Sequence, residues 1–191
     1  AQREAAGLDR ILFLARDCHF LSEVFLTLYP CDSFELVQVS RNALATDPDG
    51  FARYLLGGGL QHALVCDLVS TGYSWLRFSE TIHQPLNFFA LVYIDNYQYQ
   101  SFDSARLHQP GPFRFSYAVK SSELNARCLA VELLNTAPHG STLGVHPVGG
   151  GFAPDFEVQH ELPPSLLKTL LLAQAAAIQC LRPRRAAVSR E

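Results

Sequence analysis

The stretch Ala63–Ser74, with the sequence ALVCDLVSTGYS, indicates the fold of this chain more clearly than any other. It begins with the apolar run Ala63–Cys66, which is typical of a short strand buried on both faces of a parallel sheet. Asp67 follows, and the polar segment Ser70–Ser74 leads into helical spacing over Trp75–Ile82. We therefore predict a strand, then a loop that starts at Asp67, then a helix.

The same alternation of strand and helix recurs on both sides of this stretch. Short apolar runs predict strands, and runs with helical spacing between them predict helices. The predicted strands are Ile11–Ala15, Phe34–Val39 and Asn87–Ile94, and the predicted helices are one between Cys18 and Pro30, Phe51–Leu56 and Leu124–Leu134. This order favours an α/β fold with a mostly parallel sheet flanked by helices.

The pattern is irregular in the C-terminal half. The stretch from about Tyr97 to Phe115 is rich in Gln, Ser, Pro and Tyr and predicts a surface loop or small lid. The glycine-rich segment Gly149–Gly151 predicts a loop before a final helix over Leu166–Leu181, which we expect to pack on the core and to be too short to span a bilayer. A chain of 191 residues favours one domain (1–191), with a core over about 8–96 and a lid or acceptor region with the C-terminal helix over about 97–185.

The composition excludes several classes of protein. With 48% hydrophobic and only 17% charged residues, the chain can form a real core. Its formal net charge of −3 gives no general attraction to nucleic acid or to anionic membranes, so we expect neither as a partner. The polar start argues against a signal peptide, and the scattered cysteines lack ligand spacing for zinc. We expect free thiols, no transmembrane segment and a cytoplasmic location.

Three polar segments follow the predicted strands: Arg16–Cys18, Ser40–Asn42 and the loop that starts at Asp67. Because ligands of open α/β sheets bind beyond the carboxyl ends of the strands, we expect these segments to form one site. In the third loop, Gly72 lets the backbone approach an anion, and the next helix supplies free N–H groups and a favourable dipole.

The hydroxyls of Ser70, Thr71 and Ser74 add hydrogen-bond donors to that loop, and Asp67 can accept hydrogen bonds from sugar hydroxyls. An ordinary helix start capped by serine or threonine explains the same spacing. The spacing therefore leaves a phosphate cradle and a plain helix cap as equal alternatives.

The loop resembles the ribose-phosphate loop of type I phosphoribosyltransferases. That pattern has four apolar residues, two acidic ones, two apolar ones and then Ser/Thr-Thr-Gly-x-Ser/Thr, with Tyr73 at the variable position here. Cys66 occupies the place of the first acidic residue. The resemblance implies that the acidic residues hold the ribose hydroxyls and that Ser70–Ser74 bind the 5-phosphate.

The same resemblance places Arg16 in a pyrophosphate loop and Arg41 where these enzymes carry a basic residue that contacts pyrophosphate. The planar guanidinium matches phosphate oxygens, which supports these roles. Exposed charges or salt bridges are the alternative interpretation of both arginines. The resemblance further implies Mg²⁺, held mainly through the substrate.

A narrower resemblance covers about 11–141. The motifs FLARDCHFL, QVSRNAL, VCDLVSTGYS and LAVELLNTAPHGS are similar, in this order, to a bacterial family of modules in glycan-synthesis proteins with FLARDG, SRRAL, VDxGxSG and ELxxAPxGS motifs. Cys18 replaces the glycine of the first motif. The resemblance implies transfer of 5-phosphoribosyl from phosphoribosyl pyrophosphate to a sugar hydroxyl of a bacterial polysaccharide. A separate phosphatase, and other glycosyltransferases, would act with it or be fused to it.

Such a transfer requires a general base. Asp17, in the first loop, is the first candidate. Glu132 lies in an apolar segment, so it is either functional or half-exposed. His139, in the Pro-His-Gly turn, either binds the acceptor or is a surface histidine. Cys18 next to His19 suggests a thiol nucleophile only weakly, because adjacent residues at a helix start point in different directions.

Three further interpretations stay open. Tyr93, Tyr97 and Tyr99 either stack on acceptor sugars or line a strand and its loop. The chain is alternatively a non-catalytic module that binds a phosphorylated sugar, which the two cysteine replacements favour. Members of the narrower family are often labelled as haloacid-dehalogenase-like hydrolases, but that phosphatase chemistry needs a second acidic residue two positions after Asp17, where this chain has His19.

Overall fold

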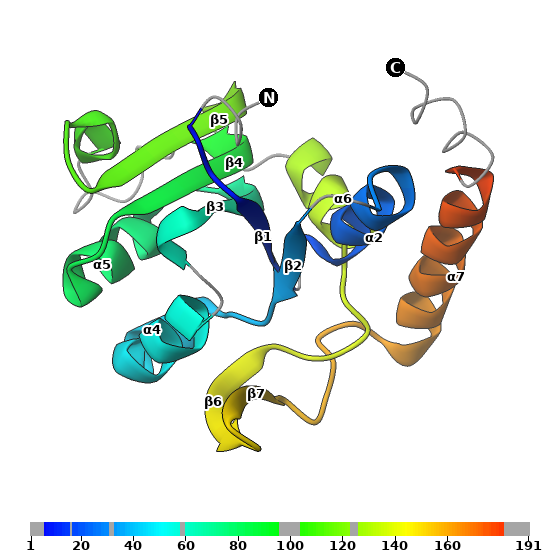
Figure 1. Cartoon of the computed structure of the whole chain (residues 1–191). Coiled ribbons are helices and arrows are strands. Elements are labelled where there is room, and N and C mark those ends of the chain that lie inside the picture. Colours follow the sequence, from blue (N-terminus) through cyan, green and yellow to red (C-terminus); the bar gives the residue numbers. More distant parts are fainter. Residues whose placement is uncertain are drawn as a thin grey trace.

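A parallel five-stranded sheet forms the centre of the molecule (Figure 1). The computed structural model describes residues 6–15, 17–30, 33–57, 60–95, 104–122 and 126–181. Within these residues the strand order is β2-β1-β3-β4-β5, and each neighbouring pair is parallel. The strands are β1 (Arg10–Leu14), β2 (Phe34–Val37), β3 (Ala63–Ser70), β4 (Leu86–Ile94) and β5 (Phe113–Ser121). The predicted α/β class is therefore confirmed.

Helices cover both faces of this sheet (Figure 1). On one face lie α3 (Arg41–Thr46), α4 (Pro48–Gly57) and α5 (Tyr73–Ile82). On the other lie α2 (His19–Leu28) and α6 (Ala126–Leu134), and α7 (Pro164–Leu181) packs beside α2. Both faces of the central strands are thus removed from water, which explains why these strands appear in the sequence as continuous apolar runs.

Two apolar clusters fill the space between the sheet and its helices. In the first, the Trp75 ring of α5 stacks on Phe88 of β4, with the ring centroids 5.8 Å apart. In the second, Phe13 and Leu68 pack with the thiols of Cys18, Cys66 and Cys128. The prediction that the cysteines are free, buried thiols is confirmed for these three, whereas Cys180 is free but exposed.

Strand β3 is longer than predicted. It runs through Asp67 to Ser70, so the prediction of a loop that starts at Asp67 is wrong. The reason is that Leu68 and Val69 are buried and continue the pairing with β4. The turn into α5 is consequently reduced to Thr71 and Gly72.

The prediction of a loop or lid up to Phe115 is also wrong for the described residues. Ser104–His108 form a short 3-10 helix, and β5 adds a fifth parallel strand against β4. The core sheet therefore extends past the predicted boundary at 96. Tyr97 and Tyr99 lie outside the described residues, and Tyr93 is buried in β4, which excludes sugar stacking by its ring in this arrangement.

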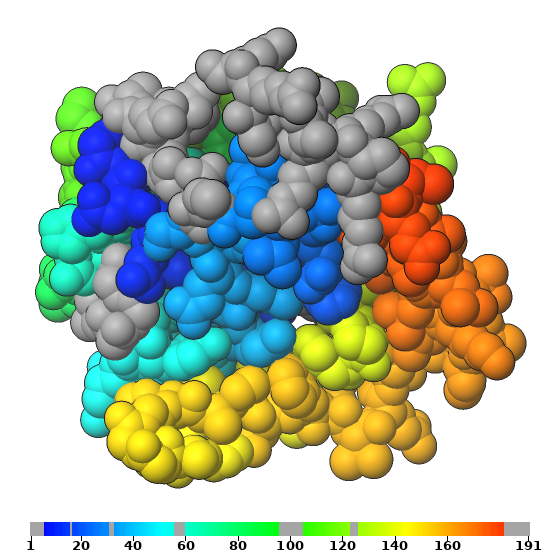
Figure 2. All heavy atoms as spheres, turned by 45° about the vertical axis from the view of Figure 1, so that its right-hand side comes forward, coloured from blue at the N-terminus to red at the C-terminus, as the bar shows by residue number. Residues whose placement is uncertain are grey.

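The glycine-rich segment before the last helix is a hairpin turn rather than a plain loop. It joins β6 (Thr142–Val148) and β7 (Gly151–Phe156), which pair antiparallel. Gly149 and Gly150 have φ values of 54° and 88°, the left-handed backbone that two-residue hairpin turns require. Figure 2 shows the hairpin, in yellow, along the lower edge of the molecule next to α4 in cyan.

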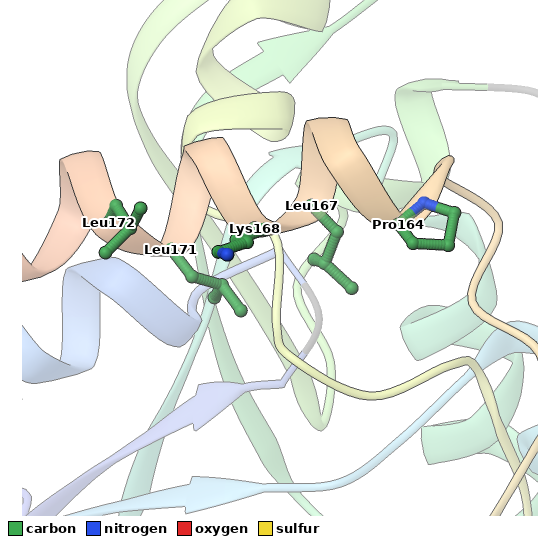
Figure 3. Close-up of a pocket in the computed structure, with 5 residues that line it drawn as sticks. All are labelled: Pro164, Leu167, Lys168, Leu171 and Leu172. Atoms are coloured by element: carbon green, nitrogen blue, oxygen red, sulfur yellow. The ribbon is translucent and has the colours of Figure 1, made fainter.

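The final helix, α7, starts two residues before the predicted position. Leu170 and Gln174 are buried, and Gln174 Nε2 donates hydrogen bonds to the carbonyls of Leu134 (2.9 Å) and Thr136 (3.0 Å) at the end of α6. Most of its surface is exposed, however, and Figure 3 shows the proline, the leucines and Lys168 of this helix that form the described lining of a shallow pocket. With 18 residues, α7 is long and apolar enough, by length and composition alone, to cross a bilayer. The prediction that this helix is too short to span a bilayer is therefore wrong.

Candidate functional site

A polar cavity with a volume of about 670 Å³ lies at the carboxyl ends of β1, β2 and β3. We call it the main cavity. The chain passes from β1 to β2 on one side and returns to β3 on the other, so the cavity occupies the switch point of the sheet. Ligands of open α/β sheets bind at this position. The predicted convergence of the loops is therefore present in the structure.

The β3–α5 turn forms one wall of the main cavity through Ser70, Thr71 and Ser74. Gly72 N–H donates to Ser70 Oγ (3.2 Å), and Tyr73 N–H donates to Thr71 Oγ1 (3.4 Å). The first helical bond of α5 runs from Leu76 N–H to the carbonyl of Gly72. Ser74 and Trp75 consequently supply the N–H groups that a ligand at the helix start would use.

Gly72 is required by the geometry of this turn. Its φ of 73° lies in the left-handed region, and a Cβ at this position would approach side-chain carbons of Leu107 and Phe115 to 3.1 Å. Both the backbone conformation and the surrounding space therefore select glycine. The residue is buried, and it shapes the turn without lining the cavity.

Asp67 lies in β3 and projects into the main cavity. Its Oδ1 accepts a hydrogen bond from Leu68 N–H at 2.9 Å. Burial raises the pKa of Asp67 to about 7, and the neighbouring carboxylate of Asp17 adds to this rise, against the lowering effects of Ser70, Leu68 and Arg41. At neutral pH this side chain is therefore divided between its acid and carboxylate forms.

Arg41 is the first residue of α3 and lines the opposite wall. The helix is positioned by Ser40, whose Oγ accepts from Ala43 N–H (3.1 Å) and donates to the carbonyl of Thr142 in β6 (2.6 Å). One hydroxyl thus caps α3 and ties it to the hairpin. Arg16, the other predicted pyrophosphate contact, lies outside the described residues.

Carboxylates dominate the described lining of the main cavity. Asp17, Asp67, Glu132, Glu157 and Glu161 line it, against the single described cation Arg41. Among the described residues no group of three or more side chains is placed to hold a metal ion. The neighbouring Asp17 and Asp67 nevertheless offer the one or two carboxylates with which proteins usually bind Mg²⁺ when phosphates complete its shell.

The structure brings most of the predicted site residues together. Those that line the main cavity are Asp17, Arg41, Asp67, Ser70, Thr71, Ser74 and Glu132. Three predicted ligand contacts do not line this cavity: Gly72, which is buried, Tyr73, which is exposed at the start of α5, and His139. Glu157, Glu161 and Leu143 were missed, because they come from the hairpin and the segment after it.

His139 does not line the main cavity. It lines a second cavity of about 340 Å³, which we call the side cavity. The His139 ring packs on Phe156, with centroids 4.1 Å apart, and Nδ1 lies 2.9 Å from the carbonyl of Gly140. A carbonyl only accepts hydrogen bonds, so Nδ1 carries the proton and Nε2 is the acceptor in the neutral ring. His139 is therefore half-buried rather than a surface histidine.

The thiol chemistry suggested by Cys18 and His19 has no support in the structure. Cys18 is fully buried, and its Sγ donates to the carbonyl of Cys66 at 3.5 Å. Burial raises the pKa of the Cys18 thiol, and the nearby Asp67 and Cys66 raise it further. A thiol that is buried and protonated is a poor nucleophile.

Comparisons with known proteins add no assignment. Neither a scan against protein-family models nor a search of curated proteins finds a match to this chain. The chemistry of the site therefore has to be argued from its geometry and from the motifs.

Proposed function

We propose that this chain is a phosphoribosyltransferase with a type I-like fold. It transfers 5-phosphoribosyl from phosphoribosyl pyrophosphate to a sugar hydroxyl of a bacterial polysaccharide and releases pyrophosphate. The observation that carries this proposal is the main cavity, where the β3–α5 turn, Asp67 and Arg41 line one space at the switch point of the sheet.

The donor would bind with its 5-phosphate at the β3–α5 turn. The hydroxyls of Thr71 and Ser74, with the N–H groups at the start of α5, supply hydrogen bonds and a favourable dipole. Asp67 accepts hydrogen bonds from the ribose hydroxyls, and bound donor groups that carry protons favour its carboxylate form. Arg41 contacts the pyrophosphate on the opposite wall.

The reaction breaks the bond between the anomeric carbon and the pyrophosphate oxygen and forms a bond from that carbon to the acceptor oxygen. The acceptor hydroxyl loses its proton to a carboxylate as it attacks. Asp17 is our first choice for this base because it lies in the first loop after β1 and lines the main cavity, and Glu132 is the second. Arg41, with Arg16 from the same motif set, stabilises the departing negative charge.

Mg²⁺ fits this cavity as a companion of the donor. It would be held mainly through the donor, with Asp67 as a carboxylate ligand, and it would supply charge neutralisation for the pyrophosphate oxygens. Its charge would also favour the carboxylate form of Asp67, whose pKa is raised by burial and by the neighbouring Asp17.

The remaining parts of the proposal follow from the same reaction. The product still carries a 5-phosphate, so a separate phosphatase must remove it before the ribofuranose is part of a finished glycan. Phosphoribosyl pyrophosphate is an activated sugar phosphate, and we propose that the protein uses it in the cytoplasm. The proposed reaction requires no nucleic acid as a partner.

A second candidate function is a non-catalytic module that binds the phosphorylated sugar. The observation that favours it is the position of Cys66. Its side chain is buried in the apolar cluster of β1, β3 and α6, on the other face of the strand from Asp67. Only Asp67 is then available for the two ribose hydroxyls that a pair of acidic residues holds in the resembling enzymes.

A turnover assay separates the two candidates. The full chain is incubated with phosphoribosyl pyrophosphate, Mg²⁺ and a panel of glycan acceptors, and pyrophosphate release is followed. Release that depends on both acceptor and Asp17 supports the transferase. Binding of the donor without release over the whole panel supports the sensor, and release of inorganic phosphate from simple phosphomonoesters would instead indicate a phosphatase.

A further inference from the structure

An apolar flank runs along α7, beside the face with which this helix packs on the domain. Its residues recur three or four positions apart and therefore lie on one side of the helix: Pro164, Leu167, Leu171, Ala175 and Ile178. At about 100° per residue, this flank lies roughly a quarter turn from the buried Leu170 and Gln174. Pro164 and Ala175 are exposed, and the other three are half-buried. The packing of α7 on the domain thus leaves the flank partly in water.

The first half of this flank is hollowed. A shallow pocket of about 350 Å³ is lined, among the described residues, by Pro164, Leu167 and Leu171 of the flank together with Lys168 and Leu172 (Figure 3). Leu172 is 62% exposed. The pocket therefore combines aliphatic side chains with one cation, and its described lining contains no carboxylate.

The charge of this part of the chain is positive, although the formal net charge of the whole chain is −3. Residues 164–190 contain no aspartate or glutamate and five basic residues, which are Lys168, Arg182, Arg184, Arg185 and Arg190. Three of the arginines follow the end of α7 within four positions. The net charge of the whole chain consequently does not describe this stretch, in which an apolar helix adjoins a group of cations.

We infer that α7 docks on the surface of a lipid bilayer that contains anionic headgroups. The apolar flank enters the boundary of the acyl region, and the cations meet the phosphates of the headgroups. Lys168 suits this position, because the stem of a lysine runs along apolar surface while its ammonium group reaches the headgroups. The inference goes beyond the proposed transfer reaction and does not depend on it.

The composition of α7 favours a bilayer over a protein or a nucleic acid. The helix contains no phenylalanine, tyrosine or tryptophan. Protein interfaces concentrate their binding energy in aromatic and arginine anchors, and single-stranded nucleic acid stacks its bases on aromatic rings. A flank of leucine, isoleucine and alanine provides no such anchor. It gains from any apolar medium that removes it from water, and the acyl region of a bilayer is such a medium.

The opposite contacts of α7 favour a helix that lies on the bilayer over one that spans it. Leu170 is buried against the domain, and Gln174 Nε2 donates to the carbonyls of Leu134 and Thr136. Spanning would break these two hydrogen bonds and place the Gln174 amide in hydrocarbon, which is costly. A helix on the surface keeps both contacts.

Co-sedimentation of the full chain with lipid vesicles tests this inference. Vesicles of phosphatidylglycerol and phosphatidylcholine in equal amounts present an anionic surface, and vesicles of phosphatidylcholine alone present a neutral one. We expect the chain to bind the anionic vesicles at least about tenfold more strongly than the neutral ones. This binding should weaken at least about tenfold when the salt concentration rises from about 0.1 M to about 1 M, because salt screens the attraction.

Two substitutions in α7 separate the apolar and the charged contributions. Leu172→Glu places a carboxylate at the pocket, and Lys168→Glu reverses its charge. Each should weaken binding to the anionic vesicles at least about fivefold. The controls are Val158→Glu and Arg114→Glu, which change the net charge by the same amounts at exposed positions outside α7. Both controls should bind like the wild type, and all four melting temperatures should stay close to that of the wild type.

Three results with vesicles would overturn the inference: no binding of the wild type, equal binding to both kinds of vesicle, or equal loss of binding in the α7 variants and their controls. Binding that resists high salt and yields only to detergent would indicate a spanning helix instead. Sedimentation velocity without lipid covers the remaining occupant. A dimer that Leu172→Glu dissociates, with no vesicle binding, would assign the flank to a second copy of the chain. Titration with the donor tests the proposed function separately from all these results.

Discussion

The parallel sheet and the C-terminal segment from 136 to 162 differ in what they contribute to the molecule. The sheet carries the buried apolar residues and presents Asp67, Ser70 and Thr71 at its edge. The C-terminal segment contributes few buried side chains, yet it supplies Ser141, Glu157 and Glu161 to the cavity walls. We therefore expect mutations in the two regions to separate effects on stability from effects on the cavity walls.

The largest expected effect is a loss of stability in the sheet. Phe88 is fully buried and stacks on Trp75, Phe113 and Phe115. Phe88→Ala should lower the free energy of unfolding by about 3–5 kcal/mol, as measured by urea denaturation. Phe88→Leu, which keeps most of the volume, should retain the fold and lose less.

The matched change in the hairpin is Leu143→Ala. Leu143 is 55% exposed and lines the main cavity, so the stability should change by no more than about 0.5 kcal/mol. A stability loss as large as that of Phe88→Ala would contradict the division between the two regions.

The second prediction concerns the pH dependence of Asp67. Its pKa is raised from 3.8 to about 7 in the folded chain, so the folded state holds a proton that the unfolded state releases. Stability is therefore unaffected below about pH 4 and falls as the pH rises to about 7, by up to about 4 kcal/mol. Asp67→Asn removes the charge and should be more stable than the wild type at pH 8 but not at pH 4.

Chemical denaturation at both pH values checks this prediction, with the exposed Asp9→Asn as the control. Asp67→Asn should also bind phosphoribosyl pyrophosphate more weakly, because the variant lacks the carboxylate. A variant that is less stable than the wild type at pH 8 would show that the Asp67 carboxylate stabilises the fold rather than costing stability.

The third prediction concerns the turn at Gly72. Gly72→Ala places a Cβ in a left-handed backbone conformation and against Leu107 and Phe115. It should cost about 1–3 kcal/mol of stability, visible as a lower melting temperature. Gly111→Ala is the control, because nothing lies within 4 Å of its Cβ position. Equal melting temperatures for the two variants would refute the packing argument.

The smallest expected effect concerns Ser40, which joins the two regions. Ser40→Ala removes the cap of α3 and the hydrogen bond to the hairpin, and should cost about 1 kcal/mol. Ser40→Asp keeps an acceptor for the cap but loses the hydroxyl that donates to the carbonyl of Thr142. Stability and donor affinity are measured for both variants. If Ser40→Asp regains the stability lost in Ser40→Ala but not the donor affinity, the hydrogen bond to the hairpin contributes to the site. If it regains both, the hydrogen bond has no such role.

The same contrast explains how far the sequence predicted the structure. Strands β1, β3 and β4 are buried on both faces, so their apolar runs are visible in the sequence without knowledge of tertiary contacts. Residues that follow the strands, such as Asp17 after β1 and Arg41 after β2, converge because parallel strands present their ends at one edge. For this reason most of the candidate site could be predicted from the sequence.

The missed elements lie at edges, where fewer residues are buried. Strand β5 alternates Phe113, Phe115, Tyr117 and Val119 with mainly polar residues, a period of two that indicates a half-exposed strand. The hairpin carries the paired Gly149 and Gly150, a recognised turn signal, but prolines in both strands obscure the pattern.

Other site features depend on contacts that no local pattern contains. Glu161 reaches both cavities only because the hairpin turns the chain back toward α6, and the raised pKa of Asp67 depends on Asp17 at the end of another strand. Residues far apart in the sequence create both properties. The sequence therefore predicted the β3–α5 turn and the residues at the strand ends, but not the contribution of the hairpin and of the segment after it.

Calorimetric titration with phosphoribosyl pyrophosphate and Mg²⁺ tests the central claim, that the β3–α5 turn is a phosphate cradle. The wild type should show one saturable site, Thr71→Ala should weaken it at least about tenfold, and Thr71→Ser, which keeps the hydroxyl, should stay close to the wild type. No saturable binding by the wild type, or equal affinity in wild type and Thr71→Ala, would contradict the account.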